Sequence, residues 1–231
     1  MTAPSPADRH RHGQDGHHHR GQPSGHRRRA LGWLAWPAAL AAGLPGPAAL
    51  AQAVAGRRPT PAQTEGPFYP VSLPADTDFD LLRQGGAAYA KGQPGWLDGQ
   101  VTDAGGLPLA GAVVEIWQCD AAGHYRHPGD GDRADPAFQA FGRVQADAQG
   151  RYRFRTIRPV AYSGRTPHIH LKVKQGARTL LTTQVYVAGE PGNARDVLWR
   201  GLREAERSAL TVAFQPVADG WRATFDIVVA A

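Results

Sequence analysis

The chain has 231 residues, of which 42% are hydrophobic and 20% are charged, and its formal net charge is +6 at pH 7. Residues 1–53 hold six Arg and two acidic residues, so the remainder is nearly balanced, which excludes a nucleic-acid-binding footprint in residues 54–231. The single cysteine, Cys119, excludes an intramolecular disulfide.

The first 53 residues predict a leader rather than part of a fold. Residues 1–29 are rich in His, Arg, Gly and Pro, and they offer too few large apolar side chains to form a core. Residues 26–53 join a basic segment to an apolar run that ends in a small-residue cleavage site. Arg28 and Arg29 fit the twin-arginine type of signal. Proline and glycine interrupt the apolar run, so we expect export to the periplasm or the outside, without a membrane span in the mature protein.

The mature chain predicts an irregular arm followed by short strands. Residues 54–95 are poorly periodic and rich in Pro, Gly and Ala, which favours a wrapping arm. From residue 96 onward, stretches of β-forming residues alternate with turn signals. The predicted strands are 96–103, 111–118, 151–157, 168–174, 179–187, 209–214 and 221–229, with a hairpin turn between the last two at Asp219 and Gly220.

One short helix is expected in the C-terminal half, at residues 193–208, because Val197, Leu198 and Leu202 recur at helical spacing. Many short strands joined by turns are typical of a β-sandwich. We therefore predict an all-β fold, an antiparallel sandwich over residues 96–231 preceded by the long irregular arm.

The stretch YSGRTPHIHLKV, residues 162–173, places His168 and His170 on one face of a strand, because side chains alternate between faces. Neutral imidazole binds zinc, copper, iron or nickel, but two nitrogens need further ligands. Residues 151–181 contain no Asp or Glu, which argues against a site of two histidines and one carboxylate. Tyr162 is the nearby oxygen donor, and a hard trivalent cation would stabilise its phenolate, which indicates Fe(III) rather than zinc.

A second tyrosine, Tyr125, lies in the loop after the predicted strand 111–118, where a rigid sandwich carries functional groups. Taken alone, Tyr125 is better explained as an ordinary loop aromatic. Together, however, the stretches TEGPFYP, GHYRHPGD and FRTIRPVAYSGRTPHIH resemble the intradiol ring-cleavage dioxygenases, the catechol and protocatechuate type. The likeness runs from about Gln63 to Gln184, and the ordered series Tyr, Tyr, Arg-x-x-His-x-His carries it.

The resemblance implies a β-sandwich enzyme with non-haem Fe(III) held by Tyr125, Tyr162, His168 and His170. It implies insertion of O2 between the two hydroxyl-bearing carbons of a catechol-type aromatic, giving a muconate-type dicarboxylic acid. Tyr162 would also leave the metal and help to take a substrate proton, and Arg165 would stabilise charge that develops on the ring.

The remaining implied residues surround the metal and the substrate. The resemblance places Gln184 near the iron as a catalytic group, and it places in the substrate pocket Thr64, Gly66, Pro67 and Trp117. Core packing explains Trp117 equally well, and turn chemistry explains the Gly-Pro pair. His127, two residues after Tyr125, is a rival ligand that we rank behind the other four.

Two features depart from the family pattern. No N-terminal helical dimerisation segment is recognisable, so a homo-oligomer is left open. The spacing of six residues from Tyr162 to His168 is short for the family, which predicts a more open site for larger aromatics. The partners expected are a catechol-type small molecule and O2, and no nucleic acid.

Two other functions compete with the dioxygenase. The stretch GQVTDAGGLPLAGAVVEIWQ, residues 99–118, is also typical of non-catalytic transthyretin-like or adhesin-like binding sandwiches. In such a domain the tyrosines and histidines would be coincidental. A histidine-based zinc hydrolase is disfavoured because no carboxylate base lies near the histidine pair.

Overall fold

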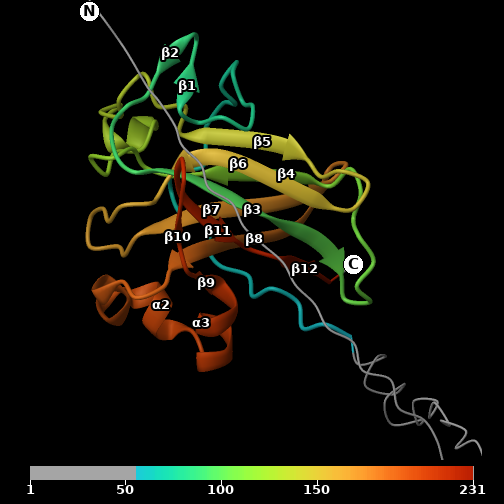
Figure 1. The fold of residues 1–231 in the computed structure, drawn as a ribbon. Helices are drawn as coiled ribbons and strands as arrows, with labels where there is room; N and C mark the ends of the chain where they lie inside the picture. Colours follow the sequence, from blue (N-terminus) through green and yellow to red (C-terminus); the bar gives the residue numbers. More distant parts are fainter. Residues whose placement is uncertain (1–55, 231) are drawn as a thin grey trace, which may run out of the picture. The chain divides into compact units, whose positions relative to one another are not determined.

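The computed structural model describes residues 56–230, and the predicted leader over 1–53 lies outside them. In this part of the chain, two five-stranded sheets form a sandwich with two short helices beside it (Figure 1). The expected all-β sandwich is thereby confirmed. None of the helices in residues 56–230 combines the length and the apolar character needed to cross a bilayer.

The first sheet is built around β3 (Pro94–Asp103), which pairs antiparallel with β6 (Arg151–Ile157). On its other side, β11 (Gly220–Thr224) pairs with the first half of β3 and β12 (Ile227–Val229) with the second half, both in parallel. The strand β10 (Gln215–Val217) completes the sheet beside β11.

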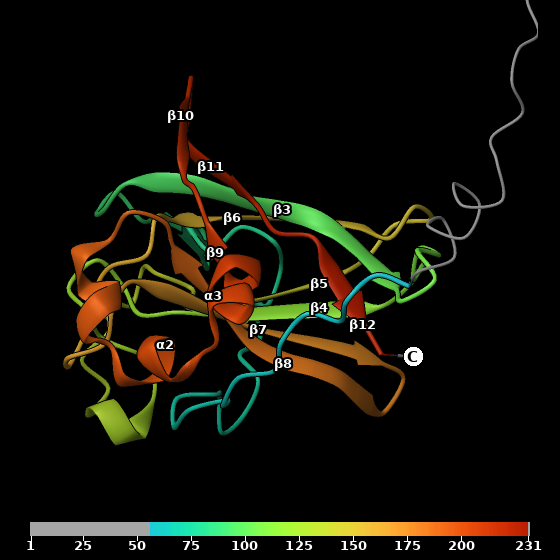
Figure 2. The ribbon, with the colours of Figure 1, turned by 90° about the horizontal axis from the view of Figure 1, so that it is seen from below.

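The second sheet carries the histidine pair. Its strand order is β5 (Phe141–Gln145), β4 (Val113–Trp117), β7 (His168–Gln175), β8 (Arg178–Val187) and β9 (Thr211–Val212). The strand β7 lies at the centre, and its His170 is opposite Trp117 on one side and Gln184 on the other. Figure 2 shows the two sheets as separate layers, with β3 in one and β7 and β8 in the other.

Side chains alternate along β7, and both faces of this strand are buried. Ile169, Leu171 and Val173 belong to the core between the sheets, where each fully buried side chain of this size contributes about 1.5–3 kcal/mol. His168 and His170 therefore point away from that core, to the face covered by loops and by the arm.

The arm ties both sheets together by backbone hydrogen bonds. The N–H of Thr60 donates to the carbonyl of Val228 in β12, and the N–H of Gln63 donates to the carbonyl of Thr182 in β8. Farther along, the arm forms a small hairpin of β1 (Arg83–Gln84) and β2 (Ala87–Ala88). The predicted arm is thus largely irregular, and it ends two residues earlier than expected because β3 begins at Pro94.

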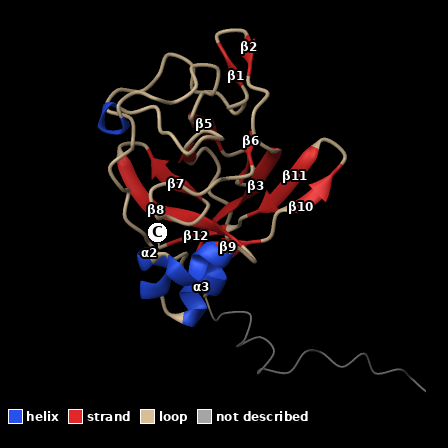
Figure 3. Cartoon of the chain, turned by 90° about the vertical axis from the view of Figure 1, so that its left-hand side faces the viewer, coloured by secondary structure: helices blue, strands red, loops and turns tan. Residues whose placement is uncertain are grey.

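The single predicted helix is instead two, α2 (Val197–Gly201) and α3 (Glu204–Leu210), after a 3-10 turn, η2 (Pro191–Arg195). Figure 3 shows α2 and α3 together on one side of the strands. Leu202 and Arg203 adopt extended backbone with ψ of 147° and 158°, which interrupts the helical ladder between them. The sequence pattern predicted one continuous helix because Leu202 is an apolar, buried residue at helical spacing from Leu198.

The C-terminal strands also differ from the expectation. The turn at Asp219 and Gly220 joins β11 to β10 and not to 209–214, of which Thr211–Val212 pairs with β8. The stretch 221–229 is divided into β11 and β12, and the pairs of β3 with these two strands are parallel. The sandwich is therefore mixed rather than wholly antiparallel.

Candidate metal centre

The side chains of His168 and His170 meet at the start of β7. Their exposed fractions are 1% and 0%, and their Nε2 atoms lie 3.2 Å apart. Two imidazole nitrogens bound at right angles, each about 2.1 Å from one ion, are separated by about 3 Å. The spacing therefore suits two neighbouring ligands of one metal.

The protonation of His168 favours this use. Its Nδ1 lies 2.7 Å from the carbonyl oxygen of Thr166, which only accepts, so Nδ1 carries the proton and Nε2 presents a lone pair. Burial and the nearby charge of Arg165 lower the pKa of His168 to about 4, against the Thr166 hydrogen bond. Burial also lowers the pKa of His170, with His168 adding to the effect. Both rings are therefore neutral near pH 7, as metal ligands must be.

Tyr125 approaches from the loop between β4 and β5. The carboxylate of Asp120, which is buried, accepts the N–H groups of Ala122 and His124 and so shapes this loop. The N–H of Tyr125 donates to Asp130 at 2.8 Å. The Tyr125 ring lies 6.0 Å from that of His170, and its buried hydroxyl oxygen has no hydrogen-bond partner among residues 56–230. Such an atom is costly unless something absent from the protein chain satisfies it.

Tyr162 is positioned by a tight turn that precedes β7. Ser163 and Gly164 have φ of 38° and 76°, and the N–H of Arg165 donates to the carbonyl of Tyr162 at 2.6 Å. Two positive φ values in succession define a type I′ turn, which reverses the chain within two residues. The Tyr162 ring lies 4.9 Å from that of Tyr125 and 5.5 Å from that of His168. The four predicted ligands thus converge.

This donor set fits a metal ion with hard character. Residues 56–230 hold no group of three or more His, Cys, Asp or Glu placed to bind a metal, so both phenols are needed for a full set. Burial raises the pKa of Tyr125 well above its ordinary value and also raises the pKa of Tyr162. A strongly attracting cation would have to offset that burial for either phenol to ionise.

Arg165 is fixed beside these ligands by two side chains. Its Nε donates to Asp196 and its Nη2 donates to Gln184, both at 2.7 Å. Gln184 in turn donates to the carbonyl of Thr64 at 2.9 Å. The structure therefore brings the side chains of Arg165 and Gln184 together, and it connects both to the arm.

Two of the other predicted pocket residues, Gly66 and Trp117, lie against His170. Gly66 lies against its ring, because an added Cβ would be 3.2 Å from His170 Cε1. Trp117 stacks on the same ring, with centroids 4.9 Å apart and planes at 8°, and it is buried with Tyr125 and Phe141. It therefore packs behind the imidazole. Pro67 is exposed on the arm.

The side chain of His127 forms a hydrogen bond within its own loop. Its Nδ1 accepts the N–H of Gly129 at 2.9 Å, and it forms the cap of η1 (Pro128–Asp130). This contact occupies one of the two imidazole nitrogens of His127, and its rank behind His168 and His170 as a ligand stays a prediction.

Comparison with known proteins gives the family. The dioxygenase family matches residues 64–231. The beta chain of protocatechuate 3,4-dioxygenase from Burkholderia cepacia is 42% identical over 130 residues, which cover 51% of this chain and 54% of the relative. Catechol 1,2-dioxygenase 2 from Acinetobacter lwoffii is 32% identical over 172 residues, covering 67% of this chain and 58% of the relative. The chain belongs to the intradiol ring-cleavage dioxygenase family.

This chain spans a little over half the length of these two curated relatives. One solved structure that this chain resembles is the dioxygenase domain of a dioxygenase and carbohydrate-binding protein fusion from Streptomyces sp. SirexAA-E. It is 32% identical, with a TM-score of 0.61, and the match covers 75% of this chain and 99% of that one.

Three residues near the centre of this family member were not predicted from sequence. Phe68 stacks on Tyr125, with centroids 4.5 Å apart and planes at 17°. Cys119 is packed beside Tyr125, and burial raises the pKa of its thiol to about 12. Asp196 holds Arg165 from 31 positions along the chain. Only Asp196 had a local signal, because an Asp before an apolar helical stretch is typical of an N-cap.

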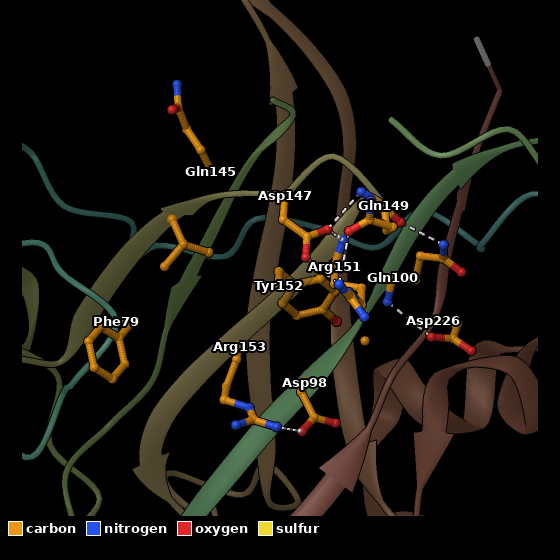
Figure 4. Close-up of a pocket in the computed structure, with 12 residues that line it drawn as sticks. Phe79, Asp98, Gln100, Gln145, Asp147, Gln149, Arg151, Tyr152, Arg153 and Asp226 are labelled. Atoms are coloured by element: carbon orange, nitrogen blue, oxygen red, sulfur yellow. Dashed lines mark hydrogen bonds and ion pairs between the residues drawn. The ribbon is translucent and has the colours of Figure 1, made fainter. Parts of the chain in front are cut away.

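Two cavities differ in whether predicted site residues line them. A cavity of about 290 Å³ is lined by Tyr162, Arg165, Thr166 and Arg195, so it adjoins one predicted ligand and the arginine. A larger hollow of about 910 Å³ lies along β3, β5 and β6 and contains none of the predicted site residues (Figure 4). Charged groups there pair with one another, including Arg151 with Asp147.

Proposed function

We propose that this chain is a non-haem Fe(III) intradiol dioxygenase that uses O2 to open a catechol-type ring between its two hydroxyl-bearing carbons. The product would be a muconate-type dicarboxylic acid. The observation that carries the proposal is the convergence of two phenols, Tyr125 and Tyr162, on the facing Nε2 atoms of His168 and His170.

Tyr125, Tyr162, His168 and His170 would hold the iron. When bound, Fe(III) would supply Lewis-acid activation of the catecholate and a template for its reaction with O2. The neutral imidazoles need lose no proton to bind, because burial already keeps both uncharged.

The chain's own groups supply the remaining chemistry. Tyr162 lines the cavity of about 290 Å³ and is less buried than Tyr125, so its Oη is the phenol oxygen placed to accept a substrate proton. Arg165 lines the same cavity, and its fixed guanidinium stabilises negative charge on a substrate oxygen. Phe68 stacks on Tyr125 and Trp117 stacks on His170, which fixes the orientation of both rings.

Oxygen uptake tests the proposal directly. Iron-loaded protein is incubated with catechol, hydroxyquinol, protocatechuate and larger lignin-type catechols under 18O2. We expect one O2 consumed per ring opened, with both labelled atoms in a dicarboxylic acid. No ring opening with any substrate rejects the proposal, and a semialdehyde product would reject the intradiol position of cleavage.

The short connection from Tyr162 to His168 supports a preference for the larger catechols in this panel. In the structure these residues are joined by the turn at Ser163 and Gly164 and only a few further residues. We expect kcat/KM for a lignin-type catechol to exceed that for catechol, and the opposite order would reject the preference.

We also propose export by the twin-arginine route, which would suit an enzyme that acts on environmental phenolics. The basis is the order of basic and apolar residues in 26–53. Replacement of Arg28 and Arg29 by Lys should leave uncleaved protein inside the cell. Unchanged fractionation of this variant would contradict the proposal.

A further inference from the structure

We propose that Asp196 is a positioning residue for ring opening, because it holds the Arg165 guanidinium beside Tyr162. The inference rests on the proposed function and adds a residue that the sequence did not single out. Asp196 has an exposed fraction of 0%, so its carboxylate depends on protein contacts alone.

The two carboxylate oxygens of Asp196 have separate tasks. Oδ2 accepts the Nε–H of Arg165 at 2.7 Å and the N–H of Thr166 at 2.9 Å. Oδ1 accepts the N–H groups of Leu198 and Trp199 at 2.9 and 3.0 Å, which caps α2. One oxygen therefore serves the reaction site and the other serves the helix.

Arg165 needs this partner to stay in place. Its side chain is largely buried and only Asp196 forms an ion pair with it among the described residues. Gln184 is neutral and fixes the other arm of the guanidinium, at Nη2. The backbones of Tyr162 and Arg165 are hydrogen-bonded to each other across the turn, and both residues line the same cavity, so the guanidinium lies beside that phenol.

The contact with Thr166 extends the influence of Asp196 toward the metal centre. Thr166 Oγ1 donates to Asn193 at 2.7 Å, and the Thr166 carbonyl accepts from His168. A disturbance at Asp196 could therefore act through Arg165 or through His168. The test must separate these two routes.

Asp196→Asn is the sharpest variant. An amide keeps one oxygen, which can still cap α2, and it replaces the Arg165-facing oxygen by an NH2 group that cannot accept a hydrogen bond. The variant is made in the wild-type protein and in Arg165→Ala, and steady-state ring opening is measured for all four proteins. If Asp196 acts through Arg165, kcat/KM falls about 10- to 100-fold in the wild-type background, and Asp196→Asn adds little, less than about threefold, to Arg165→Ala.

Equal losses in the two backgrounds would show a structural role and overturn the inference. So would wild-type kcat/KM in Asp196→Asn. Iron content and the visible spectrum provide a second readout, because a route through His168 lowers both whereas a route through Arg165 leaves both unchanged. If the wild type opens the ring but the effects of Asp196→Asn and Arg165→Ala are independent, this inference alone is rejected. If the wild type opens no ring, the proposed function is rejected as well.

Two further variants keep the result interpretable. Asp147→Asn is the matched control, since Asp147 is an exposed partner of Arg151 beside the larger hollow and should leave kcat/KM unchanged. Asp196→Ser replaces the amide if Asp196→Asn does not fold, because serine is a strong helix cap that lacks the contact with Arg165. The same coupling is then expected for Asp196→Ser.

Discussion

Gly66 offers a direct test of how the arm shapes the metal centre. Its φ is +71°, and an added Cβ would lie 3.2 Å from Cε1 and 3.9 Å from Nε2 of His170. The imidazole cannot move freely, because the Trp117 ring stacks on it with centroids 4.9 Å apart. Gly66→Ala should therefore displace either the arm or the His170 ring by a few tenths of an ångström.

Two costs are expected from this substitution. The left-handed backbone costs an L-residue about 1–2 kcal/mol. The displaced imidazole adds a loss at the centre of about 1.4 kcal/mol, equivalent to a tenfold fall in kcat/KM or in iron affinity. The first cost appears in the free energy of unfolding, and the second appears only in turnover and metal content.

Gly111→Ala is the matched control. Gly111 has a φ of +73°, and apart from its chain neighbours no atom of residues 56–230 lies within 4 Å of the added Cβ. It lies between β3 and β4, away from the histidines. Denaturant unfolding, iron content and ring opening are measured for both variants. Both should lose about 1–2 kcal/mol of stability, but only Gly66→Ala should lose iron or turnover. Equal turnover in the two variants would refute the contact between the arm and His170.

Three further outcomes follow from the structure. In metal-free protein, the pKa of His168 is lower in the folded state than in the unfolded chain, so the unfolded chain binds the proton first as pH falls. The free energy of unfolding should therefore fall by about 3 kcal/mol as pH drops from 6.5 to about 4. A urea-unfolding profile that is flat over that range would contradict this. Lys172 is buried, lies 3.4 Å from an aromatic ring centroid and pairs with the half-exposed Glu65 of the arm. Glu65→Gln leaves the buried Lys172 ammonium without its ion-pair partner, so it should cost more stability than Lys172→Met, which removes the buried charge and keeps an apolar side chain. The reverse order would contradict the role of this ion pair in holding the arm. Tyr152→Phe removes a buried hydrogen bond of 2.5 Å to a backbone carbonyl and should cost about 1–2 kcal/mol with unchanged turnover; a loss of turnover would show that the first sheet influences the centre.

The strands with strict alternation were predictable from sequence. The strand β6 spans Arg151–Ile157 as expected, and β7 begins at His168 as expected, because in each strand one phase is apolar. The strand β5 was not predicted. It contains Gly142, whose missing Cβ leaves room for Leu81 of the arm, and that requirement is visible only after folding.

The site was predictable in part. Strand geometry alone places His168 and His170 together, and chemistry favours Tyr162 as an oxygen donor. Nothing local brings Tyr125 to the same point, because its position depends on a loop of another strand held by Asp120 and Asp130. Only the resemblance to a known family supplied it. Asp196 depends in the same way on long-range packing of η2 and α2.

The central claim is that Tyr125, Tyr162, His168 and His170 bind one ferric ion. Metal analysis combined with visible absorption of the iron-loaded protein tests it most directly. The account predicts one iron per chain and a reddish tyrosinate-to-iron absorption that shifts in Tyr162→Phe and again in Tyr125→Phe. A colourless protein, or an absorption unchanged by both substitutions, would contradict it.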